Sequence, residues 1–327
     1  MGTPEPGPAP DRTARKDANG FPLRRLLQWL LLAAAIAYLG YYLRDQWLAL
    51  RADVTLLEPW LLLAGSLAVA GMLALKSLYH LVVLRRLGHS GPPAPAAIVS
   101  AYALSQVVRY LPGKVLGVIF EAERLAPHIP AHRVVAANII QSLYTMALTF
   151  GVLGAAAVWL FDGGPWLAWL ACVSLVVATW SAHRLHLVER AMFRLASRIP
   201  RLREYATLPA TSSRWSLRAA LILLCEWLPY FLFWALLLPA DEDPFRTAIL
   251  LGSCYAGASL AANFAVIAPS GLFVREAIFL WMGSQLAVAP STVILLGMAA
   301  RLAFTMADLL FAALAWGAEA ITRRGVA

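Results

Sequence analysis

Long apolar runs, separated by short polar segments, follow one another along the chain from residue 26 to residue 316. A helix needs about 20 apolar residues to cross the hydrocarbon of a bilayer, and six runs approach or exceed that length. They are 26–43, 60–84, 134–160, 166–182, 216–238 and 292–316. The pattern predicts an all-α integral membrane protein with about six spanning helices.

Two further apolar stretches, 96–125 and 246–287, are interrupted by charged residues next to proline and glycine. The first interruption reads Arg-Tyr-Leu-Pro-Gly-Lys at 109–114, and the second reads Pro-Ser-Gly-Leu-Phe-Val-Arg-Glu at 269–276. Proline and glycine free backbone groups that lipid cannot satisfy, so such breaks must line protein or water. We therefore expect two re-entrant hairpins, giving up to eight hydrophobic helical units. For 246–287 two full spans are an open alternative, because its arms are longer.

Basic residues flank the spans at four places, which the positive-inside rule assigns to the cytoplasm. They are Arg24 and Arg25, Arg85 and Arg86, eight arginines within 183–218, and Arg323 and Arg324. The stretch 96–125 must then begin and end inside, and 246–287 must begin and end outside. Each half of the chain, about 23–160 and 166–320, becomes two spans, a broken stretch and a span. This order predicts an inverted repeat, as in many transporters, with both termini in the cytoplasm.

The membrane domain is expected to cover 23–320, between two cytoplasmic tails. Residues 1–22 are rich in proline and alanine without apolar periodicity, which is typical of disorder, and 321–327 form the second tail. Within the domain, 183–215 has the pattern of a basic amphipathic segment whose residues 184–203 contact anionic lipids of the inner leaflet. A positively charged topogenic loop explains most of the same residues.

The composition agrees with a membrane protein, because 61% of the residues are hydrophobic and only 14% are charged. The net charge of +9 lies beside the apolar runs, which favours anionic lipid headgroups over nucleic acid as its partner. Three scattered cysteines indicate neither disulfides nor a metal site, and no nucleotide-binding or catalytic motif is present. We therefore expect no cofactor and no metal, and an enzyme is the less favoured class.

Arg109 and Lys114 flank the first break, and Lys114 stands at the start of the next predicted helix. Two cations beside the free N–H groups of a helix start suit a phosphate group. The alternative is a hairpin tip whose two cations snorkel to the cytoplasmic interface. The sequence leaves both interpretations open.

Other ionisable residues lie inside apolar sequence, where charged side chains usually face a protein interior or a wet cavity. Arg275 and Glu276 follow the second break directly, and Arg301 and Asp308 lie two helical turns apart on one face of the last span. Arg301 with Glu276, or Asp308 with Arg275, are candidate pairs. The candidate substrate-binding residues are Arg109, Lys114, Arg275, Glu276, Arg301 and Asp308.

Acids inside the spans are also candidates for proton coupling, and these are Glu226, Glu276 and Asp308. For the remaining charged residues a local account is favoured. Lys76 and His80 are expected to snorkel near the end of their span, and Arg124 is expected to pair with Glu121, one helical step away.

Residues 105–114, 269–276 and the Arg301–Asp308 spacing resemble the lysylphosphatidylglycerol synthase transmembrane-region family, over most of residues 25–320. That family includes the flippase half of the multiple peptide resistance factor and stand-alone membrane proteins. Its second motif usually reads Pro-Gly-Gly-x-Gly-x-Arg-Glu, so Ser270 and Phe273 replace glycines in this chain. The resemblance implies lipid handling without a synthase domain, with the six candidate binding residues as the matching positions.

We therefore expect a flippase-like protein that moves a phosphate-bearing lipid across the bacterial inner membrane. Its substrate would be a membrane phospholipid or a polyprenyl-type lipid, and a separate lipid synthase is a candidate partner. The alternative function is an intramembrane enzyme, or an accessory subunit of a lipid-linked transferase pathway. Both a monomer and a homo-oligomer are compatible with the sequence.

Overall fold

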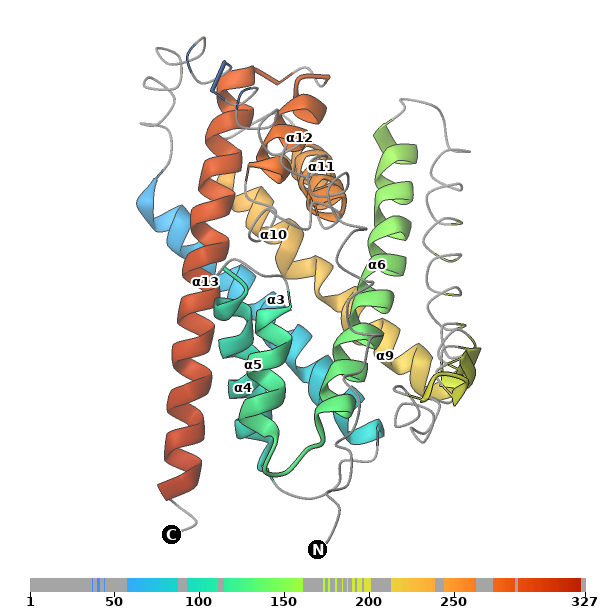
Figure 1. The fold of residues 1–327 in the computed structure, drawn as a ribbon. Coiled ribbons are helices and arrows are strands. Elements are labelled where there is room, and N and C mark those ends of the chain that lie inside the picture. The colour runs from blue at the N-terminus through green and yellow to red at the C-terminus, as the bar shows by residue number, and fades with distance from the viewer. Residues whose placement is uncertain are drawn as a thin grey trace, which may run out of the picture.

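The computed structural model describes seven continuous parts of the chain and, in addition, scattered residues and short runs within 37–44 and 173–200. The continuous parts are 58–87, 93–110, 115–160, 213–238, 244–262, 273–285 and 288–324. Every regular element of more than one turn in these parts is an α-helix (Figure 1). The helices are α3 (Pro59–Arg86), α4 (Pro95–Val108), α5 (Leu116–Leu125), α6 (Ala131–Leu160), α9 (Ser213–Cys225), α10 (Trp227–Leu237), α11 (Pro244–Ala262), α12 (Val274–Gly283) and α13 (Pro290–Arg324).

Four helical segments are long and apolar enough to cross a membrane, which confirms the prediction of a helical membrane protein. They are Pro59–Arg86, Ala131–Ala156, Leu217–Leu237 and Pro290–Arg324, and they match four of the six predicted spans. The predicted spans 26–43 and 166–182, the tail 1–22 and most of the basic segment 183–215 lie outside the described residues. The inverted repeat stays a prediction.

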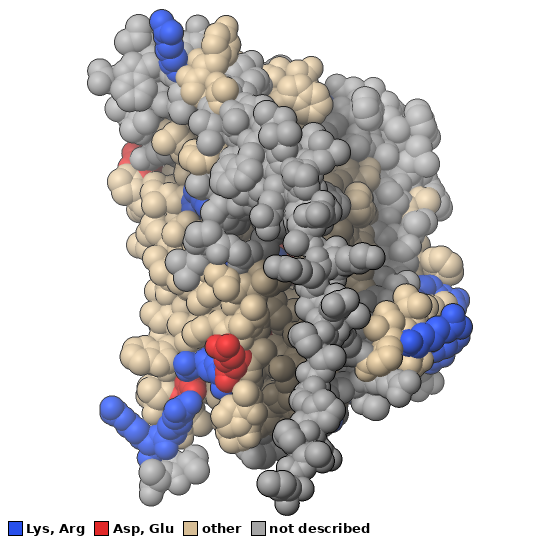
Figure 2. Space-filling model, in the orientation of Figure 1, with Lys and Arg blue, Asp and Glu red and all other residues tan. Residues whose placement is uncertain are grey.

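Outward-facing side chains of these helices are largely apolar. Leu302, Leu309, Leu314 and Trp316 of α13 are all exposed. In the space-filling view, described charged side chains form a few small, separate groups, and the described surface between them is mostly uncharged (Figure 2). A surface of this kind is stable against lipid tails, in agreement with the class of protein.

The third spanning segment is divided at Glu226, where α9 ends and α10 begins. Pro229 has no N–H group to donate to the carbonyl of Cys225, so the helical hydrogen bonds open at this point. The backbone N–H of Glu226 instead donates to the Leu223 carbonyl at 3.3 Å. A carboxylate therefore lies at the joint between two helices, in the middle of an apolar segment.

The first broken stretch forms two helices, α4 and α5, which pack against each other. Their contact is so close at Gly117 that a Cβ atom there would lie 2.7 Å from the backbone oxygen of Ser105. Only glycine permits this approach. The proline and glycine of this break, within 111–114, lie outside the described residues.

The second broken stretch is divided into α11 and α12, which also contact each other. Its Pro-Ser-Gly turn at 269–271 lies outside the described residues. The described part resumes at Phe273, the residue before α12, whose φ of 64° belongs to the left-handed region. The family resemblance has glycine at this position, where such a φ carries no steric cost.

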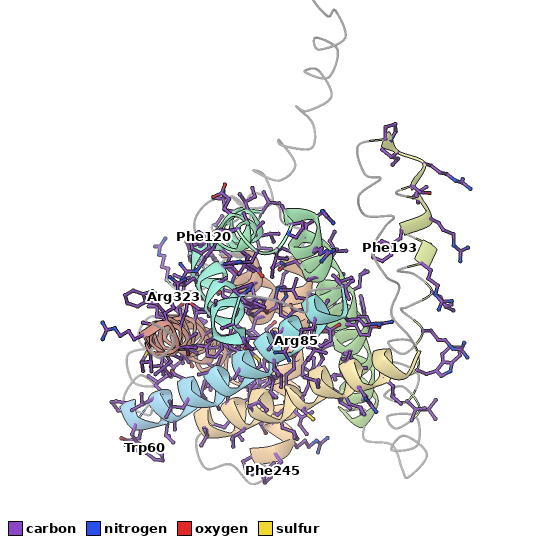
Figure 3. All side chains as sticks on the ribbon, turned by 90° about the horizontal axis from the view of Figure 1, so that it is seen from below. Trp60, Arg85, Phe120, Phe193, Phe245 and Arg323 are labelled. Carbon is purple, nitrogen blue, oxygen red and sulfur yellow. The ribbon has the colours of Figure 1, made fainter. Side chains whose placement is uncertain are left out.

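Helix α13 runs the length of the view in Figure 1 and contacts α3, α4 and α12. One buried apolar cluster joins α3, α6 and α10 to α11, α12 and α13, and Phe233, Trp234 and Phe279 are among its buried members. A second cluster joins α3 to α4, α5, α6 and α9. Seen from below, the helices surround a centre that is crowded with side chains (Figure 3). Members of the first cluster, among them Met72, Trp227 and Tyr230, also line the cavity described next.

Candidate functional site

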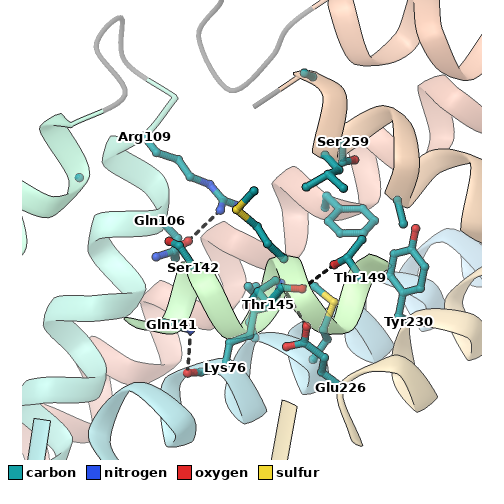
Figure 4. A pocket seen from close by; sticks show the side chains of 18 of the residues that line it. Lys76, Gln106, Arg109, Gln141, Ser142, Thr145, Thr149, Glu226, Tyr230 and Ser259 are labelled. Carbon is teal, nitrogen blue, oxygen red and sulfur yellow. Dashed lines mark hydrogen bonds and ion pairs between the residues drawn. The ribbon is translucent and has the colours of Figure 1, made fainter. Parts of the chain in front are cut away.

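A cavity of about 590 Å³ lies between the helices, lined by residues of α3, α4, α5, α6, α10, α11, α12 and α13. A close view shows polar side chains from several of these helices turned toward one space (Figure 4). Its lining includes the cations Lys76, Arg109, Arg275 and Arg301, and one carboxylate, that of Glu226. The described wall of the cavity is therefore strongly cationic.

Arg109 directly follows α4 and reaches across to the middle of α13. Its guanidinium donates to Asp308 at 3.0 Å and to Gln106 at 2.8 Å. The Tyr110 hydroxyl donates to the same oxygen of Asp308 at 2.6 Å. The Arg109 side chain is 42% exposed, whereas that of Asp308 is 1% exposed. The cation thus faces the cavity, and its counterion lies behind it.

Arg275 and Arg301 share the second carboxylate. Arg275 donates to Oε1 of Glu276 at 3.0 Å, and a guanidinium nitrogen of Arg301 lies 3.7 Å from the same oxygen. The Arg275 guanidinium also lies 4.8 Å from the centre of the Tyr255 ring. The structure thus pairs Arg301 with Glu276, as the sequence suggested. The other candidate pair, Asp308 with Arg275, is wrong, because Asp308 instead forms an ion pair with Arg109.

The two groups of charges form one arginine cluster, because Tyr110 lies between them. The Arg109 and Arg301 guanidinium groups lie 5.9 and 5.6 Å from the centre of its ring. The cluster contains three guanidinium groups, of Arg109, Arg275 and Arg301, against two carboxylates, of Glu276 and Asp308. Among the described residues it therefore has one positive charge in excess. Lys114, the remaining candidate, lies outside them.

Lys76 and Glu226 form a separate pair on the cavity wall, with the Lys76 nitrogen 3.8 Å from the carboxylate. The predicted snorkelling of Lys76 is wrong, since the side chain turns inward to this acid. Glu226 is 4% exposed, and its second oxygen has no hydrogen-bond partner among the described residues. The pair is neutral, so it leaves the excess charge of the arginine cluster in place.

The snorkelling prediction is also wrong for His80, because this residue is completely buried. Its Nε2 lies 2.6 Å from Glu121, which is equally buried, and its Nδ1 lies 2.9 Å from Oε1 of Gln141. The Gln141 amide donates to Tyr102 and to the backbone oxygen of Lys76, so its oxygen must face His80. Nδ1 therefore has the hydrogen, and one proton joins Nε2 to Glu121.

The predicted local pair of Arg124 with Glu121 is wrong as well. Arg124 instead donates to Glu319 at 2.8 Å, near the C-terminal end of α13, where Arg323 also contacts Glu319. Glu121 is occupied by His80 and by the Asn138 amide at 3.0 Å. Each acid has a partner from a distant part of the chain, His80 for Glu121 and Arg124 for Glu319, which i,i+3 spacing does not reveal.

One face of α6 forms a polar stripe along the cavity, made of uncharged residues at helical spacing. They are Asn138, Gln141, Ser142, Thr145 and Thr149. Its ends, Asn138 and Thr149, are eleven positions apart, which is about 16 Å along a helix. This stripe is absent from the sequence-based predictions, although its 3–4 residue spacing inside an apolar span is visible in the sequence.

Comparisons of this chain with protein-family models, with curated proteins and with solved structures find no match. The resemblance to the lysylphosphatidylglycerol synthase transmembrane-region family therefore stays a prediction that rests on its motifs. Within the described residues, no group of three His, Cys, Asp or Glu comes together to hold a metal ion.

Proposed function

We propose that this protein is a flippase-like translocator, which moves a phosphate-bearing lipid across the bacterial inner membrane. The observation that supports this proposal most directly is the arginine cluster, in which three guanidinium groups border one cavity and, among the described residues, two carboxylates face them. A phospholipid or a polyprenyl-type lipid would place its phosphate at these cations while its tails stay in the bilayer.

The energetic argument rests on charge burial. An uncompensated cation at membrane depth costs about 3 kcal/mol or more, so the excess positive charge favours an anionic ligand. Guanidinium groups bind phosphate through paired, charge-assisted hydrogen bonds. A phosphodiester has a single negative charge and would make the cluster neutral. Arg109 is the most exposed of the three arginines, so it is the first that an entering phosphate would contact.

The position of the cluster supports translocation rather than surface binding. Asp308, the partner of Arg109, lies near the middle of Pro290–Arg324, so the break after α4 meets a spanning helix at mid-length. We infer that α4–α5 and α11–α12 are re-entrant hairpins of an inverted repeat, with both termini in the cytoplasm. The cavity would then open to the two leaflets in turn.

The movement of the lipid also needs a driving force, which protons or a lipid gradient would supply. Glu226, Glu276 and Asp308 are the candidate proton carriers, and Glu226 is the one that lines the cavity and keeps a carboxylate oxygen without a partner among the described residues. A lipid gradient made by a separate synthase would drive movement without protons. The segment 184–203 would hold the protein against anionic lipids of the inner leaflet.

Reconstitution of the purified protein into liposomes tests this function. Lipids with a fluorescent label on one tail are placed in both leaflets, and an impermeant quencher reports how fast the inner pool reaches the outside. We expect rapid loss of the inner pool of an anionic phospholipid, compared with protein-free liposomes. No movement of any phosphate-bearing lipid would contradict the proposal. Turnover only when a lipid-linked donor is supplied would favour the transferase alternative.

A further inference from the structure

The cavity has a second chemical character besides its cations, which is a set of hydrogen-bond acceptors. The hydroxyl groups of Ser142, Thr149 and Ser259 all line it. Each donates its hydrogen to a carbonyl oxygen one turn back on its own helix, at 2.8, 2.8 and 2.7 Å. A hydroxyl has one hydrogen and two lone pairs, so these groups have only acceptor capacity left for a ligand.

Two further side chains point to the same conclusion. Both amide hydrogens of Asn138 are used, by Glu121 and by the Val134 carbonyl, which leaves its oxygen as an acceptor. The free carboxylate oxygen of Glu226 is buried on the cavity wall without a partner among the described residues. A buried acceptor that no donor meets is costly, so the ligand is expected to supply donors at this side.

Donors on a lipid headgroup are hydroxyl or ammonium groups, and the charge of the cavity distinguishes them. Four cations and one carboxylate line the described wall, and that carboxylate already faces Lys76. A second ammonium would enter a field that is already positive and would be repelled. Hydroxyl groups donate hydrogen bonds without adding charge.

We propose that the substrate headgroup is anionic and hydroxylated, with its phosphate at the arginine cluster and its hydroxyl groups at the acceptor side of the cavity. This inference rests on the proposed function and specifies its substrate class. It disfavours an aminoacylated headgroup, which carries an ammonium. The polar stripe of α6 extends for about 16 Å, longer than one small headgroup, and offers successive acceptor positions along the path.

The test compares three lipids with the same labelled tail in the leaflet assay. Phosphatidylglycerol has a phosphodiester and two hydroxyl groups, phosphatidylmethanol has the phosphodiester alone, and phosphatidylethanolamine has an ammonium. We expect phosphatidylglycerol to move about tenfold faster than phosphatidylmethanol, the size that one or two neutral hydrogen bonds give. Phosphatidylethanolamine should be the slowest of the three.

Thr149→Val removes one acceptor and keeps the branched shape, so it should reduce the ratio of phosphatidylglycerol to phosphatidylmethanol rates severalfold. Ser259→Ala provides a second variant in case the first does not fold. Thr322→Val is the matched control, because Thr322 makes the same bond to the carbonyl one turn back, at 2.8 Å, but is exposed near the end of α13. It should leave the ratio unchanged.

The outcomes separate this inference from the function on which it rests. Equal rates for phosphatidylglycerol and phosphatidylmethanol would overturn the hydroxyl assignment and leave anionic lipid movement standing. Fastest movement of phosphatidylethanolamine would overturn it in favour of an ammonium headgroup. A wild-type ratio in both Thr149→Val and Ser259→Ala would overturn the acceptor side. Movement of none of the three lipids would contradict the proposed function itself.

Discussion

At the scale of single residues, Phe273 has a backbone conformation that L-amino acids rarely adopt, with φ at 64° just before α12. Left-handed backbone costs a residue with a Cβ about 1–2 kcal/mol, whereas glycine is free of this penalty. We expect the free energy of unfolding of Phe273→Gly to exceed that of Phe273→Ala by about 1 kcal/mol. Phe273→Gly should therefore unfold at the higher temperature. Both variants lose the ring, so the difference isolates the Cβ. Equal melting in detergent would contradict the strained backbone.

Also at this scale, one proton holds the buried contact between His80 and Glu121. Glu121→Gln places an amide N–H where that proton lies, so the hydrogen bond survives and stability should change little. Glu121→Leu leaves Nε2 of His80 and one amide hydrogen of Asn138 without a partner, and breaking such a buried pair costs about 3–5 kcal/mol. Thermal unfolding in detergent measures both variants. Equal destabilisation by glutamine and leucine would show that the proton arrangement is wrong.

At the scale of elements, the close contact between α4 and α5 requires a residue without a Cβ atom at position 117, which is Gly117. A methyl group there would lie 2.7 Å from a backbone oxygen, which is unable to turn away. We expect Gly117→Ala to destabilise the protein by about 1–3 kcal/mol, as overpacking does. Gly71→Ala is the control, because nothing lies within 4 Å of its added Cβ and alanine favours helices. Equal melting of the two variants would argue against close packing of the hairpin arms.

Features at the scale of elements were the most predictable from the sequence, because the hydrophobicity of a segment depends only on the residues within it. Four spans lie where the apolar runs predict them, α4 ends at Val108 just before the first charged interruption, and α12 begins at Val274 within the second. The pairs of Glu226 with Lys76, Glu121 with His80 and Glu319 with Arg124 were missed. Their partners lie 41 or more residues away in the chain, and only the packing of helices brings them together. Local spacing wrongly favoured snorkelling and i,i+3 pairing instead.

At the scale of the whole molecule, the charge of the arginine cluster links stability to function. Arg109 faces Asp308, and Arg275 faces Glu276, each at 3.0 Å, whereas Arg301 lies at 3.7 Å from an oxygen already in use. Arg301 therefore supplies the excess positive charge. A site that is kept positive in the absence of its ligand is expected to be less stable than a neutral one, and to gain stability when an anion binds.

The most direct measurement of the central claim is the leaflet assay on Arg301→Gln, with thermal unfolding measured on the same preparation. The substitution leaves both close pairs intact and makes the cluster neutral, so we expect unchanged or higher stability. Movement of an anionic phospholipid should fall about ten- to hundredfold, the worth of a charge-assisted hydrogen bond. Arg324→Gln, at the exposed end of α13, is the control and should keep the wild-type rate. Wild-type lipid movement by a stable Arg301→Gln protein would contradict the account.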